Sequence, residues 1–305
     1  MKNTLSFAYR FFIFSLFFGC NSTESISRDL KGSDLIKAEL LEQRVLHNGE
    51  EREYFLYVPD SYNENTEYPV LLNFHGFGGN AKDYINYESD FRDVAEQEGV
   101  ILVYPQGSLL SGFSHWNAAP MAEDNKSNTD DIGFIELLIR NLQQDLSVDP
   151  NRIYATGFSN GGMFSYALGC FTEGLIAGVA AVSGLQLNLE DCSPSHPISV
   201  LIAHSTTDDV IPYAGSSDVA SVDETVSFWR TANQTSSEAK ESRHNLGDET
   251  VWIYTYTGGT NGSEVLHYKV DNGMHMWFDH IIEEQSFASL MWDFLSPQSL
   301  SGRED

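Results

Sequence analysis

Residues 152–170 read RIYATGFSNGGMFSYALGC and contain the pattern Gly-x-Ser-x-Gly centred on Ser159. The residues before the pattern predict a strand, and the residues after it predict a helix. In that setting the serine occupies a sharp, strained turn with its hydroxyl exposed above a sheet. The flanking glycines let the strand and the helix approach closely without a Cβ clash. The stretch therefore predicts an α/β protein with Ser159 as a nucleophile, the alternative being a glycine-rich turn with an incidental serine.

Short apolar runs alternate with helical segments on both sides of this motif. Further strands are predicted at 69–74, 100–104, 177–182, 198–203, 251–257 and 265–270, and further helices at 91–98, 132–146, 222–232 and 281–295. This alternation predicts a mostly parallel sheet with helices on both faces. Two earlier strands, 39–45 and 52–58, flank Asn48-Gly49, which is a strong hairpin signal. We therefore expect an antiparallel N-terminal hairpin at one edge of the sheet.

The composition limits the class of partner. The chain has 305 residues, is 41% hydrophobic and carries a formal net charge of −27. This length and hydrophobic content suffice for one sizeable core. Nucleic-acid binding needs a basic surface that releases counterions from phosphates. The acidic balance therefore argues against a nucleic-acid partner and is typical of a soluble protein in a salty medium.

The first twenty residues predict export. Lys2 and Arg10 flank the start of an apolar run, 11–18, that is followed by Gly19-Cys20. This pattern is typical of a signal peptide, and the run is too short for a membrane-spanning helix. Cys20 resembles the lipidated cysteine of bacterial lipoproteins, which would anchor the protein in the cell envelope. The alternative is an ordinary secretory peptide and a periplasmic or secreted protein.

The remaining chain is predicted to form one domain. Residues 21–36 are rich in serine and charge and predict a tether, 37–298 the α/β domain, and 299–305 a short tail. Two further cysteines, Cys170 and Cys192, form an even pair, which in an exported protein suggests a disulfide.

A nucleophilic serine needs a base, and the base needs an acid that orients it. In α/β-hydrolases these follow the serine in the order acid, then histidine. The loop after the predicted strand 198–203 offers Asp208 and its neighbour Asp209. After that loop, His275 lies between the last predicted strand and the last predicted helix, where the fold needs a base. His280 is the competitor, and its place at a helix start is more typical of a solvated residue.

An oxyanion hole requires two backbone N–H groups that meet the charge of the tetrahedral intermediate. One donor is the residue after the nucleophile, Asn160, and the other lies in a loop after an early strand. The segment His75-Gly76-Phe77-Gly78-Gly79 fits that loop, with the N–H of Phe77 as the donor.

Several segments together are similar to a known esterase group. They read LLNFHGFGG (71–79), DDIGFIELLI (130–139), VDPNRIYATGFSNGGMFSYALGC (148–170), HSTTDDVIPYAG (204–215) and DNGMHMWF (271–278). These segments resemble bacterial serine esterases of the polyhydroxybutyrate depolymerase-like and feruloyl esterase-like group, near carbohydrate esterase family one. The resemblance spans about residues 50–297 and implies the α/β-hydrolase fold.

Carried over residue by residue, the resemblance implies catalytic roles for Ser159, Asp208 and His275. It favours Asp208 over Asp209, implies Phe77 and Asn160 as oxyanion donors, and implies a Cys170–Cys192 pair. Trp116 also matches a family element and is predicted, with Trp277, to line the substrate cleft. The chain departs from the family at Ser205, Met274 and Met276, which puts substrate detail in doubt.

The resulting hypothesis is an exported serine esterase that hydrolyses acetyl or feruloyl-type esters on polysaccharides or their fragments. A polyester depolymerase is the runner-up, and a lipid-anchored binding protein without catalysis is the alternative from another class. The sequence has no metal-binding spacing, no Walker-type loop and no dinucleotide fingerprint, so we expect no metal and no cofactor.

Overall fold

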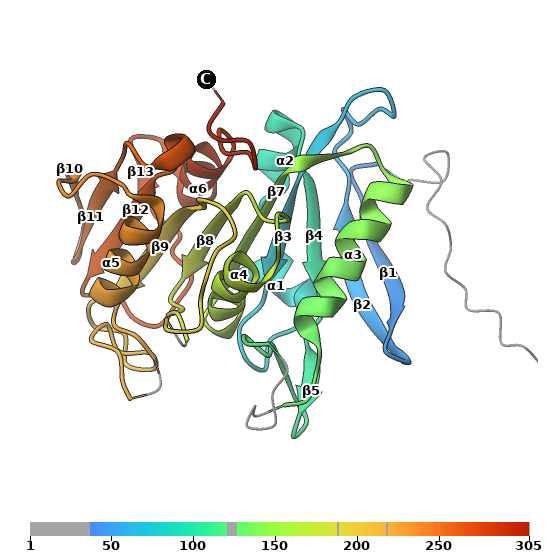
Figure 1. Cartoon of the computed structure of the whole chain (residues 1–305), viewed down its shortest axis with the longest axis horizontal. Helices are drawn as coiled ribbons and strands as arrows, with labels where there is room; N and C mark the ends of the chain where they lie inside the picture. Colours follow the sequence, from blue (N-terminus) through green and yellow to red (C-terminus); the bar gives the residue numbers. More distant parts are fainter. Residues whose placement is uncertain (1–36, 121–126, 188, 218, 305) are drawn as a thin grey trace, which may run out of the picture.

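A ten-stranded sheet forms the centre of the protein (Figure 1). The computed structural model describes residues 37–120, 127–187, 189–217 and 219–304. The strand order is β1-β2-β4-β3-β7-β8-β9-β12-β11-β10. The six central strands, from β4 to β12 in this order, pair in parallel, and both ends of the sheet pair antiparallel.

The strands of this sheet are β1 (Leu40–His47), β2 (Glu50–Tyr57), β3 (Tyr68–Phe74), β4 (Ile101–Pro105), β7 (Val148–Phe158), β8 (Gly178–Val182), β9 (Ser199–Ser205), β10 (Lys240–Leu246), β11 (Glu249–Tyr256) and β12 (Val265–Asp271). Strands β3, β4, β8 and β9 are buried along their whole length. Such continuous burial is what a parallel sheet covered on both faces requires, and it explains why these strands appear in the sequence as unbroken apolar runs.

Helices cover both faces of the sheet (Figure 1). One face carries α3 (Asp131–Asp145), α4 (Asn160–Phe171) and α5 (Val222–Asn233), whose buried side chains join one apolar cluster. The other carries α1 (Ala81–Tyr87), α2 (Arg92–Glu98) and α6 (Phe287–Leu295), which join a second cluster. Helices on both faces of a mostly parallel sheet, with an antiparallel N-terminal hairpin, make this the α/β-hydrolase fold that the sequence predicts.

Three regions contain elements that were not among those predicted. The segment after β4 contains the hairpin β5 (Ser108–Leu110) and β6 (Phe113–His115). A polar segment that was not predicted to be ordered forms the edge strand β10. The short α1 was also missed; its start is capped by Asn80, whose side chain accepts from the N–H groups of the first turn.

The closing helix is shorter than predicted. Residues 281–286 form the small hairpin β13 (Ile281–Ile282) and β14 (Gln285–Ser286), and α6 begins only at Phe287. The hairpin turn has positive φ at both Glu283 and Glu284, a conformation incompatible with a helix. Ser286 then caps α6 by accepting from the N–H of Ser289.

The predicted signal peptide, Cys20 and the tether 21–36 lie outside the described residues. Within the part that the structure describes, no helix has the length and apolar character needed to cross a membrane.

Candidate active site

Ser159 lies in the tight turn between β7 and α4. Its backbone has φ 53° and ψ −118°, a strained conformation for a residue with a side chain. The turn is held by close packing, because a Cβ added to Gly161 would lie 2.0 Å from the carbonyl oxygen of Phe74. A Cβ on Gly157 would lie 2.4 Å from the carbonyl oxygen of Gly161. Only glycine fits these positions, which is the physical basis of the Gly-x-Ser-x-Gly pattern.

Ser159, His275 and Asp208 form a continuous hydrogen-bonded chain. The Nε2 atom of His275 lies 2.9 Å from the Oγ of Ser159, and its Nδ1 lies 2.8 Å from the Oδ2 of Asp208. Asp208 comes from the loop after β9 and His275 from the loop after β12. Parallel strands bring these loops to the same edge of the sheet as the β7–α4 turn. The structure therefore brings together all three residues that the sequence selects.

The carboxylate of Asp208 is held in one orientation. Its Oδ1 accepts from the N–H groups of Val210, at 2.9 Å, and Ile211, at 2.8 Å. Burial alone would raise the pKa of Asp208, but the bonds from His275 and from these two N–H groups outweigh it and keep the pKa below its ordinary value. Asp208 is therefore ionised near neutral pH, whereas its competitor Asp209 is exposed and takes no part in this chain.

A second histidine, His204, lies against the same carboxylate. It is fully buried at the end of β9, and its Nε2 lies 2.8 Å from the carbonyl oxygen of Ile211 and 3.4 Å from the Oδ2 of Asp208. Because a carbonyl oxygen can only accept, the hydrogen is on Nε2. Burial lowers the pKa of His204. His204 supports the loop of Asp208, a role that chain order could not reveal.

The loop of His275 is anchored on both sides. The hydroxyl of Ser183 donates to the carbonyl oxygen of Met276 at 2.9 Å. Trp277 is 7% exposed and packs edge-on against Tyr84 and Phe91. The expectation that Trp277 lines the cleft is therefore wrong: its indole anchors the loop in the core.

The competitor His280 is also placed differently from the expectation of a solvated residue at a helix start. Its Nδ1 lies 2.8 Å from the hydroxyl of Tyr268, and its Nε2 lies 2.8 Å from the Oε2 of Glu249. These contacts connect the segment after the His275 loop to β12 and β11.

The side chain of His75 holds the predicted oxyanion loop in place through hydrogen bonds to backbone groups. Its Nε2 lies 3.0 Å from the backbone N of Gly107, whose N–H donates, so its hydrogen is on Nδ1. That Nδ1–H donates to the carbonyl oxygen of Gly76 at 2.7 Å. Burial lowers the pKa of His75 to about 4. The ring is therefore neutral near neutral pH and holds the loop that presents Phe77.

Trp116 connects the two segments that carry the predicted oxyanion donors, Phe77 and Asn160. The side chain of Asn160 accepts from the backbone N–H of Trp116 at 2.7 Å and donates to its carbonyl oxygen at 3.0 Å. The indole N–H of Trp116 donates to the carbonyl oxygen of His75 at 3.0 Å. Trp116 is 2% exposed and stacks on Phe164. The sequence suggested that Trp116 lines the cleft. The buried indole instead connects the loop of Phe77 to the start of α4.

A cavity of about 290 Å³ borders this loop. It is lined by residues 75–80 together with Asp83, Tyr84, Glu88 and Phe158. Ser159 and His275 do not line it, but Phe158 does, and the ring centroid of Phe158 lies 4.9 Å from that of His275. A larger hollow of about 610 Å³ lies over α5 and the Cys192 segment, and none of Ser159, His275 and Asp208 lines it.

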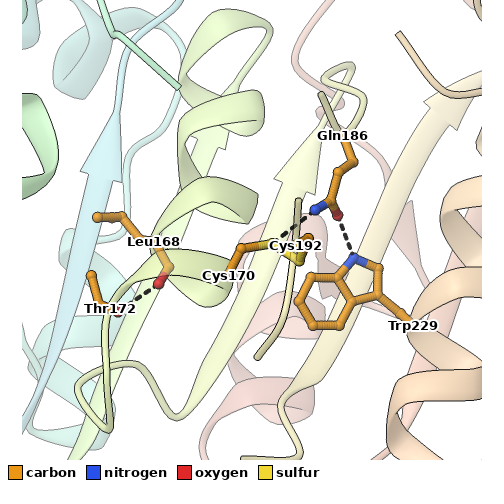
Figure 2. The surroundings of a disulfide bond; sticks show 6 residues. All are labelled: Leu168, Cys170, Thr172, Gln186, Cys192 and Trp229. Atoms are coloured by element: carbon orange, nitrogen blue, oxygen red, sulfur yellow. Dashed lines mark hydrogen bonds between the residues drawn. A yellow bond between two sulfur atoms is a disulfide. The ribbon is translucent and has the colours of Figure 1, made fainter. Parts of the chain in front are cut away.

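The predicted pair Cys170–Cys192 is bonded as a disulfide in the structure. The side-chain N–H of Gln186 donates to the Sγ of Cys170 at 2.8 Å, and Gln186 accepts from the indole N–H of Trp229 at 2.8 Å (Figure 2). The described residues contain no group of three or more His, Cys, Asp or Glu side chains arranged to hold a metal ion.

Comparisons with known proteins agree on the class of protein. A model of the phospholipase/carboxylesterase family matches residues 62–252. The chain is 33% identical over 175 residues to a probable feruloyl esterase C of Aspergillus flavus, covering 56% of this chain and 60% of that protein. It is 25% identical over 256 residues to a bifunctional acetylxylan esterase/xylanase of Neocallimastix patriciarum, covering 83% and 34% respectively. The chain thus spans about 60% of the length of the feruloyl esterases that it matches.

Solved structures share the fold. An acetyl xylan esterase from Aspergillus awamori superimposes with a TM-score of 0.59 at 13% identity, over 84% of this chain and 99% of that one. A CE1 ferulic acid esterase from Anaeromyces mucronatus gives a TM-score of 0.57 at 16% identity, over 88% and 92%. Because the family match covers more than half of the sequence, the chain belongs to the phospholipase/carboxylesterase family.

Proposed function

We propose that the protein is a serine carboxylesterase that hydrolyses esters carried by carbohydrates. The observation that carries the proposal is the unbroken chain from the Oγ of Ser159 through the ring of His275 to the carboxylate of Asp208. A free serine hydroxyl is a weak nucleophile, and a neutral imidazole at hydrogen-bond distance is what activates it.

In the proposed mechanism, the Oγ of Ser159 attacks the ester carbonyl while its proton passes to the Nε2 of His275. Asp208 accepts from Nδ1 and stabilises the imidazolium that forms. The N–H groups of Phe77 and Asn160 meet the negative oxygen of the tetrahedral intermediate. His275 then protonates the departing alcohol, which leaves an acyl group on Ser159. Water, deprotonated by His275, releases the acid and restores the serine.

The cavity beside the oxyanion loop supports a bulky acyl group. Its volume is about 290 Å³. A cavity of this size can accept a group larger than acetyl. Asp83 and Glu88 line it and offer carboxylate acceptors to a phenolic hydroxyl. We therefore favour a feruloyl-type acyl group over acetyl, in keeping with the names of the feruloyl esterase relatives.

We also propose that the enzyme is exported and held in the cell envelope by a lipid on Cys20. The basic and apolar segment before that cysteine supports the proposal. Cys20→Ser should move the full chain from the membrane fraction to the soluble fraction. An unchanged distribution would contradict the anchor and leave the esterase proposal intact.

The first experiment compares hydrolysis of methyl ferulate, p-nitrophenyl acetate, acetylated xylan and a polyhydroxybutyrate film. Ser159→Ala should fold normally and lose nearly all activity, because serine and histidine act as a unit. Asp208→Asn should lower kcat by about 10⁴-fold, the order found when a triad acid becomes an amide. Asp209→Asn is the matched control, since the neighbouring carboxylate is exposed, and should leave kcat unchanged.

The outcomes separate the alternatives. Release of ferulate that vanishes in Ser159→Ala supports the proposal, and a preference for acetylated xylan would contradict the assignment of the acyl group. Clearing of the film alone would move the protein to the polyester depolymerases. A fully active Ser159→Ala enzyme would overturn the mechanism.

A further inference from the structure

Two exposed phenylalanine rings stack beside the predicted oxyanion loop. Phe77 and Phe113 are each 57% exposed, and their ring centroids lie 5.7 Å apart with an angle of 27° between the planes. Isolated exposed apolar residues are common, but a stacked exposed pair is an aromatic surface of a kind that marks binding sites. We call this pair the Phe77–Phe113 platform.

The platform is held rigidly. Phe113 begins β6, and the hairpin turn before it has positive φ at both Ser111 and Gly112, which suits a tight two-residue turn. The backbone N–H of Gly78 donates to the carbonyl oxygen of Ser114 at 2.7 Å, and the hydroxyl of Ser114 donates to the carbonyl oxygen of Gly79. The hairpin and the loop of Phe77 are therefore fixed to each other before any substrate binds, which limits the entropy lost on binding.

The position of the platform limits what can bind there. The backbone N–H of Phe77 is the proposed oxyanion donor. The ring of Phe77 therefore lies no farther from the reacting carbonyl than the length of its own side chain allows. The acyl part of the ester is an end group, and the half-enclosed cavity lined by residues 75–80 can hold it. A sugar within a polymer continues in two directions and needs an open surface. The platform provides such a surface next to the reacting bond.

The chemistry of the platform favours a neutral sugar ring. The negative face of an aromatic ring attracts the C–H bonds on the face of a sugar ring, and the flat contact also removes apolar surface from water. The net charge of −27 disfavours acidic polysaccharides. We propose that the Phe77–Phe113 platform binds the sugar that carries the ester, as the alcohol subsite of a neutral polysaccharide; this rests on the proposed esterase function.

The test compares two substrates with the same acyl group, methyl ferulate and a feruloylated arabinoxylan oligosaccharide. In Phe113→Ala, the ratio of kcat/KM for the oligosaccharide to kcat/KM for methyl ferulate should fall about tenfold, mainly through KM, which corresponds to about 1.4 kcal/mol. Leu109→Ala is the matched control. Leu109 is 72% exposed on the same hairpin, but it pairs with Ser114 while Phe113 pairs with Leu110, so its side chain lies on the opposite face. Its ratio should equal that of the wild type.

A binding measurement separates this proposal from the esterase proposal. An arabinoxylan oligosaccharide without ferulate is titrated into the Ser159→Ala protein with and without Phe113→Ala, and the chemical shifts of the aromatic protons are followed by NMR. Saturable shifts that disappear with Phe113→Ala support the platform even if no ester is hydrolysed. An unchanged substrate ratio or an absence of oligosaccharide binding would each overturn it.

Discussion

At the scale of single residues, the structure gives different tasks to chemically identical rings. His275 has a serine hydroxyl on one nitrogen and a carboxylate on the other, which is the setting of a base. His75 accepts on Nε2 from a backbone N–H and donates from Nδ1 to a carbonyl oxygen, so a proton added to Nε2 would displace the N–H of Gly107. His75 is therefore a structural element of the predicted oxyanion loop and holds it only as a neutral ring.

This assignment predicts a specific dependence of stability on pH. The pKa of His75 is about 4 in the folded protein and about 6.5 in an unfolded chain, so the unfolded chain takes up a proton first as the pH falls. The stabilisation is complete above about pH 6.5 and is lost as the pH falls toward 4. The difference amounts to about 3 kcal/mol. Urea unfolding at several pH values should show a shallower loss in His75→Gln than in the wild type.

The control for this measurement is His244→Gln, on the edge strand β10. Its pH profile should run parallel to that of the wild type. If the His75→Gln profile also runs parallel, the neutral structural role of His75 is refuted.

Chain order leaves few candidates for the predicted triad, because few histidines follow the acid, and the structure places the selected side chains within hydrogen-bond distance of one another. It could not predict the side-chain roles around them. The bonds between Asn160 and Trp116 join residues 44 positions apart, and nothing local in the sequence indicates them. The same holds for Trp277, whose aromatic character suggested a cleft wall. Aromatic type alone does not distinguish a core position from a binding surface, because both favour large rings.

At the scale of elements, the turn that holds Ser159 depends on contact between the backbones of β3 and α4. Gly161→Ala would place a Cβ 2.0 Å from a backbone carbonyl oxygen that cannot move aside, so we expect a loss of about 3 kcal/mol or more in the free energy of unfolding. Gly169→Ala, on the same helix, is the control. Its Cβ would meet only side chains, the nearest being Val179 at 3.2 Å, and alanine favours the helix by about 1 kcal/mol.

Chemical denaturation of both variants measures the difference. Gly169→Ala should stay within about 1 kcal/mol of the wild type, since the gain in helix propensity offsets a tight contact. Equal stabilities for the two variants would contradict the view that the turn is set by backbone contact.

The elements that the sequence predicted have a strong apolar pattern, whereas those it missed are polar or very short. The central strands are continuous apolar runs because both of their faces are covered, and this signal survives without any structure. Strand β10 is mostly exposed and polar, so only its pairing with β11 defines it. The β5–β6 and β13–β14 hairpins have strands of two or three residues, which is too short for a periodic pattern.

At the scale of the whole molecule, charge and sheet edges act together. The edge strands β1 and β10 carry charged side chains, including Glu42, Arg44, Lys240 and Arg243. Charges on an edge strand oppose pairing with the edge of another sheet. The net charge of −27 adds a general repulsion between copies, which salt screens. Both features are consistent with a protein that stays dispersed in a saline medium.

The disulfide restricts the unfolded state by closing the loop between Cys170 and Cys192, and its effect on the stability of the whole molecule can be measured directly. Cys170 and Cys192 are 22 positions apart, and the loop-entropy relation gives about 3 kcal/mol for a loop of this length. The double variant Cys170→Ala/Cys192→Ala should therefore melt about 5 °C or more below the wild type. It should still hydrolyse esters at 20 °C, because the Ser159 turn is held by the contact between Gly161 and Phe74 and not by the disulfide.

Reductant should lower the melting temperature of the wild type to that of the variant and leave the variant unchanged. If reductant lowers both melting temperatures equally, the stabilisation does not come from this bond. If neither melting temperature responds, the bond contributes little. The hydrogen bonds of Gln186 with Cys170 and Trp229 must then suffice to hold the segment around Cys192.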